Sequence, residues 1–297
     1  MSDRKILVTG ASGKLGAQVV ESLLKDLGVK PSQLIVTTRN AERLQTLAAQ
    51  GVEVREADFF SAASLENAFQ GADSMLLISM DATGPRTQAH LNAVAAAEKA
   101  GVDHIVYTSM GAAQSSPVVF AHEHAATENA INQSAIANAT ILRNNWYFEN
   151  LPEYFASVLQ TGHWLSSAGE GRVAQLSRKD LAFAAASALV KPAQGKVTLA
   201  MNGPQSLTHA DMAKLIDKVL GTSTTMVHLT DEDYQAQLES FGLPAPIVDL
   251  CVTMDQHNRA QCSDGTSEAF ETLTGKQPQP FEAWLQEHKA DLIKLVA

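Results

Sequence analysis

Three glycines near the start of the chain have the spacing of a phosphate-binding turn. Gly10, Gly13 and Gly16 stand three residues apart, after a short apolar run and before apolar residues at helical spacing. The first glycine permits a tight bend, the second lets the backbone approach a pyrophosphate, and the third lets the helix pack on the strand. The free N–H groups of the helix then favour an anion. An ordinary glycine-rich turn is the alternative, but this context favours a dinucleotide loop made of Gly10, Ala11, Ser12, Gly13, Lys14, Leu15 and Gly16.

The residue after the second predicted strand indicates which dinucleotide is bound. An acidic side chain there would bind the ribose 2′-hydroxyl of NAD, whereas an arginine accepts the 2′-phosphate of NADP. This chain has Arg39 at that position, no carboxylate before Glu42, and a second cation, Lys14, within the loop. Both cations favour NADP(H), with a solvated surface charge as the alternative for Arg39. Asp58 and Phe59 follow the third strand, where adenine would lie, and Asp58 either contacts adenine or caps a helix.

These residues need a scaffold of alternating strands and helices, and the sequence predicts one. Six apolar runs predict strands near residues 5–8, 33–38, 52–54, 74–78, 104–108 and 139–142, with helical segments between them. Such alternation predicts an α/β fold of the Rossmann type, a doubly wound parallel sheet. Ligands of these sheets bind outside the carboxyl ends of the strands. Besides the glycine loop, the residues at those ends are Arg39, Asp58, Phe59, Ser79, Met80, Asp81, Ser109 and the segment 144–147.

The pattern becomes less regular after about residue 150. Ser177 to Asp180 resembles a capping box before an alanine-rich helix, a strand follows at 197–201, and Thr208 begins a helix that ends at Gly221. Further segments predict a strand at 226–229, a helix after Thr230 and a terminal helix at 281–296. We expect residues 1–150 to form a dinucleotide-binding domain and residues 151–297 to form a smaller α/β lobe that interleaves with it and closes over the cofactor.

Composition narrows the partners and the compartment. The 297 residues are 45% hydrophobic, which is ample for a large core, and the net charge is −10. An acidic chain argues against nucleic acid and anionic membranes as partners. The sequence shows no signal peptide and no apolar run long enough to span a membrane. Cys251 and Cys262 are the only cysteines and form no CxxC pair, so we expect reduced thiols and a cytoplasmic location.

Several motifs together resemble the NmrA-like branch of the atypical short-chain dehydrogenases and reductases, nearest to its quinone and triphenylmethane-dye reductases. The most specific is LRNNWYFEN at residues 142–150, which joins the glycine loop, Arg39-Asn40, Ser79 and the segments 107–109 and 123–128. The resemblance implies a Rossmann fold with NADP across the strand ends. It places cofactor contacts on the glycine loop, Arg39, the segment 79–81, and Arg143, Asn144, Asn145, Trp146, Tyr147 and Phe148, the last group beside the nicotinamide.

The usual catalytic pair of short-chain dehydrogenases is missing from this chain. No tyrosine has a lysine four residues later, and Phe120 and His124 stand where the resemblance puts the YxxxK pair. A quinone or cationic dye can take a hydride and spread the charge, so a positioned acid is less necessary than for a ketone. His124 either supplies a proton or packs in the helix. Trp146 and Tyr147 are candidate walls for a flat substrate, or ordinary core residues.

Two other chemistries are disfavoured. The run His122-Glu123-His124 is not the HExxH pattern of zinc proteases, since Ala126 occupies the position of the second histidine, so no metal is expected. No GxSxG motif surrounds Ser109, which argues against hydrolysis. The sequence therefore favours an NADPH-dependent reductase of a quinone, an azo dye or a triarylmethane dye, acting as a monomer or homodimer on a small conjugated substrate. A non-catalytic redox sensor that binds NADP(H) is the alternative.

Overall fold

The larger lobe is built on a parallel sheet of seven strands. The computed structural model describes residues 4–80, 86–151 and 158–295. The sheet has the order β3-β2-β1-β4-β5-β6-β9, and every neighbouring pair is parallel. Its strands are β1 (Ile6–Val8), β2 (Leu34–Thr38), β3 (Glu53–Glu56), β4 (Ser74–Leu77), β5 (His104–Met110), β6 (Asn138–Asn144) and β9 (Lys196–Met201). The order reverses between β1 and β4, so their carboxyl ends flank the crevice where such sheets bind ligands.

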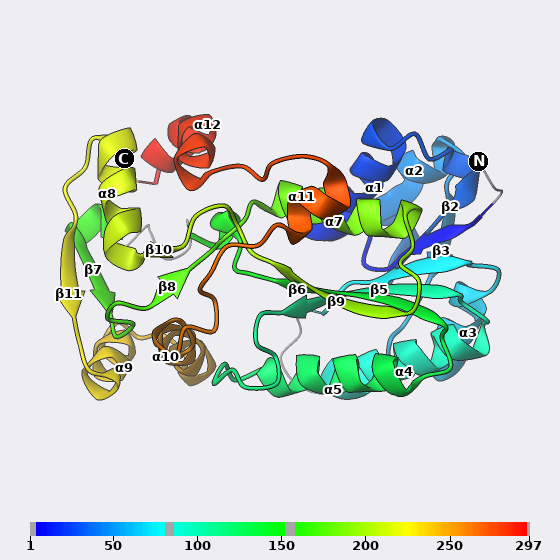
Figure 1. The fold of residues 1–297 in the computed structure, drawn as a ribbon, viewed down its shortest axis with the longest axis horizontal. Helices are drawn as coiled ribbons and strands as arrows, with labels where there is room; N and C mark the ends of the chain where they lie inside the picture. The colour runs from blue at the N-terminus through cyan, green and yellow to red at the C-terminus, as the bar shows by residue number, and fades with distance from the viewer. Residues whose placement is uncertain (1–3, 81–85, 152–157, 296–297) are drawn as a thin grey trace.

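Helices cover both faces of this sheet (Figure 1). One face carries α1 (Lys14–Glu21), α2 (Gln45–Ala49), α7 (Arg178–Val190) and α11 (Ala269–Thr274). The opposite face carries α3 (Ala62–Phe69), α4 (Arg86–Lys99) and α5 (Ala121–Gln133). Single-turn 3-10 or π segments occur at Ser22–Asp26, Pro31–Gln33, Ala41–Leu44 and Phe148–Asn150.

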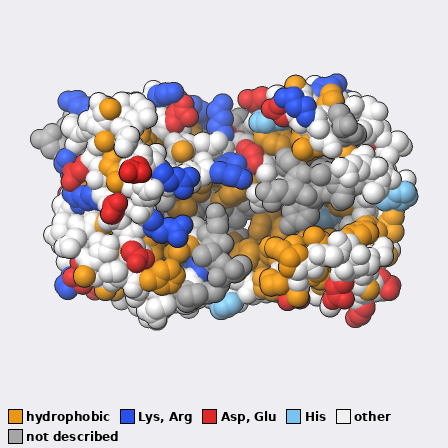
Figure 2. Space-filling model, turned by 180° about the vertical axis from the view of Figure 1, so that it is seen from behind, with side chains coloured by type: hydrophobic (Ala, Val, Ile, Leu, Met, Phe, Trp, Pro, Cys, Tyr) orange, Lys and Arg blue, Asp and Glu red, His pale blue; other side chains and the backbone are white. Residues whose placement is uncertain are grey.

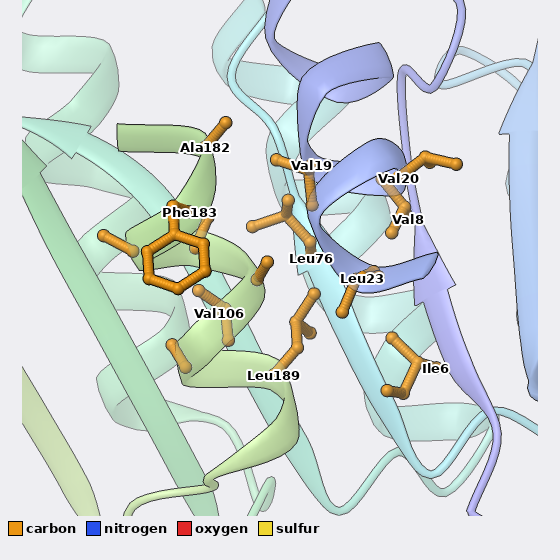
Figure 3. Close-up of a cluster of buried hydrophobic side chains, with 14 of the residues drawn as sticks. Ile6, Val8, Val19, Val20, Leu23, Leu76, Val106, Ala182, Phe183 and Leu189 are labelled. Carbon is orange, nitrogen blue, oxygen red and sulfur yellow. The ribbon is translucent and has the colours of Figure 1, made fainter. Parts of the chain in front are cut away.

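Strand side chains alternate between two apolar layers, as the two-residue period of a strand requires. Ile6 and Val8 of β1 belong to the layer under α1 and α7, whereas Leu7 belongs to the layer under α3 and α4. Figure 3 shows the first layer, where Leu23 of the π-helical segment that continues α1 and Leu189 of α7 close over the sheet. Helix α7 is thus part of the larger lobe, although it follows residue 150.

The smaller lobe lies beside the carboxyl ends of the central strands (Figure 1). Two short ribbons frame it, β7 (His163–Ser166) parallel to β11 (Thr225–His228) and β8 (Arg172–Val173) antiparallel to β10 (Leu207–Thr208). Its helices are α8 (His209–Leu220), α9 (Asp231–Ser240), α10 (Ala245–Arg259) and α12 (Phe281–Ile293). Phe148, Phe281 and Trp284 pack together in its core with ring centroids 5.2–6.3 Å apart. No described helix is both long and apolar enough to cross a membrane.

The predicted α/β fold is confirmed, with some local corrections. The helix expected at 41–50 is a 3-10 turn followed by the five-residue α2, and the terminal helix ends at Ile293 rather than 296. Ser177 caps α7, but the capping box is wrong because the Asp180 carboxylate accepts from the Gln279 N–H at 2.9 Å instead. The sequence prediction missed β7, β8, β10, α10 and α11. The division at residue 150 stays a prediction.

Candidate active site

The glycine loop has the geometry that its sequence predicts. Gly10 adopts a left-handed φ of 60°, which turns the chain from β1 towards α1. A Cβ on Gly16 would lie 2.3 Å from the Gly10 carbonyl oxygen, so only glycine permits this contact between helix and loop. Gly13 is the N-cap of α1, and no side chain caps the helix. The first-turn N–H groups therefore remain suited to an anion such as a pyrophosphate.

Hydrogen bonds tie the neighbouring strand ends to one another. The Oγ of Ser12 lies 3.1 Å from the Thr38 Oγ1, which joins the glycine loop to the end of β2. The Ile78 N–H donates to the Thr9 Oγ1 at 3.0 Å, and the Ser79 N–H donates to the Thr108 Oγ1 at 2.9 Å. These contacts bring the segments after β1, β2, β4 and β5 to one edge of the sheet. Met80 is half-buried beside them, and Asp81 lies outside the described residues.

The predicted adenosine-side residues lie at the surface. Arg39 and Lys14 are exposed, and neither forms an ion pair with any residue that the structure describes. Asp58 is also exposed, and its Oδ1 accepts from the Phe60 N–H at 3.0 Å. Ser61, not Asp58, caps α3, so the alternative role of Asp58 as a helix cap is wrong. Phe59 is half-buried, and contact of either residue with adenine stays a prediction.

Side chains at the end of β6 and in the segment after it fix this part of the chain to neighbouring elements. Arg143 forms an ion pair with Glu128, and the Asn145 Nδ2 donates to the Asn202 Oδ1 and the Ser263 carbonyl oxygen. Phe148 is buried in the core of the smaller lobe. The Tyr147 ring lies 5.7 Å from the Arg178 guanidinium, and its hydroxyl accepts from the Asn144 Nδ2. Cofactor contacts by residues 143–148 remain predictions.

His124 lies inside the larger lobe. Its Nδ1 is 2.9 Å from the Tyr107 hydroxyl, and the imidazole is only 5% exposed. Burial, with the positive charge of Arg86, lowers the pKa of His124 to about 3, and burial raises the pKa of Tyr107. Phe120 packs edge-on against the imidazole. The side chain that the sequence placed in a catalytic position is therefore a neutral, hydrogen-bonded group, and a catalytic role for it stays a prediction.

A pocket lies between the segment after β6 and the smaller lobe. It encloses about 600 Å³, including its open mouth, and Figure 2 shows the hollowed surface between the lobes with apolar side chains gathered beside it. Of the two predicted walls, Trp146 lines this pocket and Tyr147 does not. Sequence reasoning missed the other side, because it comes from separate elements of the smaller lobe. The lining there includes Trp164, His209, Tyr234, Met254 and Asn258.

The described residues include no group of three or more histidine, cysteine, aspartate or glutamate side chains that could hold a metal ion. Cys251 and Cys262 are not joined to each other by a disulfide bond. The geometry thus combines a helix N-terminus without a side-chain cap, an exposed arginine and a pocket with aromatic lining, with the segment after β6 between them.

Comparisons with known proteins agree with this arrangement. Residues 2–285 match the model of the NmrA-like family. The chain is 38% identical to quinone oxidoreductase 2 of Escherichia coli over 84% of its own length and 86% of that protein. The crystal structure of the NADPH-dependent quinone oxidoreductase of E. coli complexed with NADPH superposes with a TM-score of 0.89, at 35% identity, over 97% of this chain and 99% of that one. The Citrobacter sp. triphenylmethane reductase complexed with NADP(H) gives a TM-score of 0.87 at 33% identity, over 96% and 100%.

Proposed function

The chain belongs to the NmrA-like family, and from this premise we propose that it is an NADPH-dependent reductase of quinones and similar conjugated acceptors, dyes included. The relatives named above are an NADPH-dependent quinone oxidoreductase and a triphenylmethane reductase that binds NADP(H). The observation that carries the proposal is the position of the segment after β6. It begins at the strand edge that carries the glycine loop, and its Trp146 lines the pocket.

The residues present fit NADPH. The uncapped N-terminus of α1 offers N–H groups to the pyrophosphate, and the left-handed Gly10 and the crowded Gly16 keep the backbone close to it. The exposed guanidinium of Arg39 would hold the 2′-phosphate, with Lys14 as a weaker second cation. Bound NADPH supplies a hydride. The protein then has to hold the acceptor flat against the cofactor and exclude water. Holding the two reactants in this orientation lowers the barrier to hydride transfer.

The pocket is suited to a flat acceptor. Trp146, Trp164 and Tyr234 contribute aromatic side chains to the lining, and its polar side chains include those of Asn150, Gln175, His209, Asp255 and Asn258. A quinone delocalises the charge of the added hydride over its ring, and a triarylmethane cation takes the hydride at its central carbon and becomes neutral, so the missing YxxxK pair does not exclude either reduction. Simple ketones lack this delocalisation, and we expect them to be poor substrates.

Steady-state oxidation of NADPH and NADH against a naphthoquinone, an azo dye, a triarylmethane dye and a simple ketone tests this proposal. We expect turnover of the conjugated acceptors with NADPH and little turnover of the ketone. Trp146→Ala should raise the KM for the quinone, because the change removes an aromatic wall of the pocket. Phe241→Ala, which alters an exposed aromatic outside the pocket, is the control. Tight NADP(H) binding without turnover of any acceptor would instead favour a redox sensor.

A further inference from the structure

His209 presents an imidazole to the acceptor pocket from a fixed position. It is the first residue of α8, its ring is half-buried, and it stacks on Trp164 with centroids 4.9 Å apart and planes inclined by 19°. On its other side the Nδ1 lies 2.9 Å from the Oγ of Ser166. The Ser166 Oγ is also 2.8 Å from the Oδ2 of Asp255. The three side chains form one hydrogen-bonded chain that ends at the pocket.

The donors and acceptors along this chain can be assigned. The Asp255 Oδ2 accepts from the Ser167 N–H at 2.7 Å, and a carboxylate has no hydrogen to give. The single hydroxyl hydrogen of Ser166 therefore goes to Asp255. The Ser166 Oγ accepts from the Ala168 N–H at 3.1 Å, and its remaining contact, with the Nδ1 of His209, requires Nδ1 to be the donor. Neutral His209 thus carries its hydrogen on Nδ1 and a lone pair on Nε2.

Two physical effects keep His209 neutral. Burial disfavours the imidazolium and lowers the pKa of His209, while the negative charge of Asp255 acts in the opposite direction but is weaker. His209 also lies at the start of α8, where the positive end of the helix dipole disfavours a positively charged imidazolium. The pocket therefore receives a hydrogen-bond acceptor, since the Nε2 of a neutral imidazole protonated on Nδ1 cannot donate.

The Nε2 of His209 has no hydrogen-bond partner among the described residues, so it is available to a ligand. Asn258 supports the same conclusion from another helix. It lines the pocket, is 4% exposed, and its Oδ1 is buried with no partner in the described part of the chain. Buried polar atoms normally have partners, so unpaired ones beside a pocket point to a group that a ligand supplies.

We infer that His209 is a specificity-determining residue whose Nε2 accepts a hydrogen bond from an O–H or N–H group of the bound acceptor. The pocket would then prefer hydroxylated or amino-substituted aromatic acceptors over the same compounds with that group methylated. This inference rests on the proposed function for the identity of the ligand as an acceptor. The preference itself is a property of binding and does not require turnover.

Calorimetric titration with 2-naphthol and 2-methoxynaphthalene tests the inference, because neither compound is reduced. In the presence of NADP⁺, the wild-type protein should bind 2-naphthol about three- to tenfold more tightly, the effect of one neutral hydrogen bond. His209→Asn keeps a donor near Nδ1 and loses Nε2, and His209→Phe keeps the stack on Trp164 and loses both nitrogens. Both variants should lose the preference. His209→Gln, whose amide can replace Nε2, should retain part of it, and His228→Asn, at an exposed histidine of β11 outside the pocket, should retain all of it.

The outcomes separate this inference from the proposed function. Equal binding of the two compounds by the wild-type protein, no measurable binding of 2-naphthol, or an unchanged preference in both His209→Asn and His209→Phe would overturn it. Turnover of quinones is measured on the same samples. Turnover without a preference leaves the reductase in place and removes the role of His209, whereas a preference without turnover leaves the role of His209 and removes the reductase.

Discussion

The Arg143 guanidinium donates a hydrogen bond to each carboxylate oxygen of Glu128, from Nε to Oε1 at 2.9 Å and from Nη2 to Oε2 at 2.6 Å. The Ser109 Oγ donates to the same Oε1 at 2.6 Å, so this carboxylate joins β5, α5 and β6. Burial opposes ionisation of Glu128, but the hydrogen bonds from Arg143 and Ser109 outweigh burial and hold its pKa below the ordinary value. A residue predicted to contact the cofactor therefore also has a structural partner.

Removing Arg143 should destabilise the protein strongly. In Arg143→Met the Glu128 carboxylate, which is 2% exposed, would lose its ionic partner, and we expect a loss of about 3–5 kcal/mol in the free energy of unfolding. Urea denaturation measures this change. Lys99→Met removes a cation from a largely exposed pair with Glu66 and should cost less than about 1 kcal/mol. Equal losses of unfolding free energy in the two variants would contradict the role of Arg143 as the ionic partner that stabilises the buried Glu128 carboxylate.

Arg39 should set the preference for NADPH over NADH. A charge-assisted contact with the 2′-phosphate is worth about 1.5–3 kcal/mol, or roughly tenfold to a hundredfold in affinity. Arg39→Asp should remove that advantage and leave NADH binding similar or improved. The ratio of kcat/KM for NADPH to kcat/KM for NADH measures this preference. Lys289→Asp, which makes the same change of charge at an exposed position of α12, is the control. A wild-type preference for NADH would refute the argument.

Gly13 and Gly16 should fail in different ways. Gly13 has φ −86° and ψ 169°, which other residues adopt, and a Cβ there would meet the Gly10 oxygen at 3.2 Å. Gly13→Val should therefore fold, with a stability change of about 1 kcal/mol, and lose NADPH binding. Gly16→Val places a Cβ into the Gly10 backbone and should destabilise the fold itself. Thermal melts and titration calorimetry separate the two effects, and NADPH binding retained by Gly13→Val would remove this loop from the site.

His124 should contribute to stability rather than to acceptor preference. His124→Ala leaves the buried Tyr107 hydroxyl without this partner, which costs about 1–3 kcal/mol, and opens a cavity in addition. We expect kcat/KM for a quinone and for a triarylmethane dye to change by the same factor. A selective loss with the quinone, which needs a proton that the cationic dye does not, would instead make His124 a proton donor.

Buried histidines should make stability fall below neutral pH. Burial lowers the pKa of His90 and of His104 to about 4, from an ordinary value near 6.5. Between these values the unfolded chain binds protons that the folded protein does not, so stability decreases as pH falls from 6.5 towards 4. Each histidine contributes about 1.4 kcal/mol per pH unit in that window. His104→Gln should reduce the slope of unfolding free energy against pH by that amount between pH 5 and 6, and an unchanged slope would contradict this.

The sheet was predictable because strands such as Ser74–Leu77 and His104–Met110 are short apolar runs. Glycines and segments with a helical spacing of apolar residues separate one such run from the next. The glycine loop was predictable for the same local reason. Helix α10 was missed although its buried Val248, Cys251 and Val252 stand at helical spacing, because Pro244 and Pro246 precede them and the apolar Ile247 and Leu250 lie among them and obscure the period. Local patterns alone do not distinguish such a helix from a loop.

The pocket lined by Trp146 and His209 was not predictable from spacing along the chain. Ser166 lies 43 residues from His209 and 89 residues from Asp255, and only the packing of β7, α8 and α10 brings them together. Conversely, the position of His124 in the sequence predicted a catalytic role, but its side chain is buried against Tyr107 and does not line the pocket. A helix period says which face is apolar but not which neighbour covers it.

The late position of α7 in the chain has a consequence for synthesis on the ribosome. The apolar face of β4 and β5 that α7 covers is translated by residue 110, but α7 itself is not made until residues 178–190 emerge. The last strand of the sheet, β9, follows at residues 196–201. A nascent chain of intermediate length therefore exposes this apolar surface while about eighty further residues are added. Exposed apolar surface of this kind is where chaperones bind and where aggregation begins.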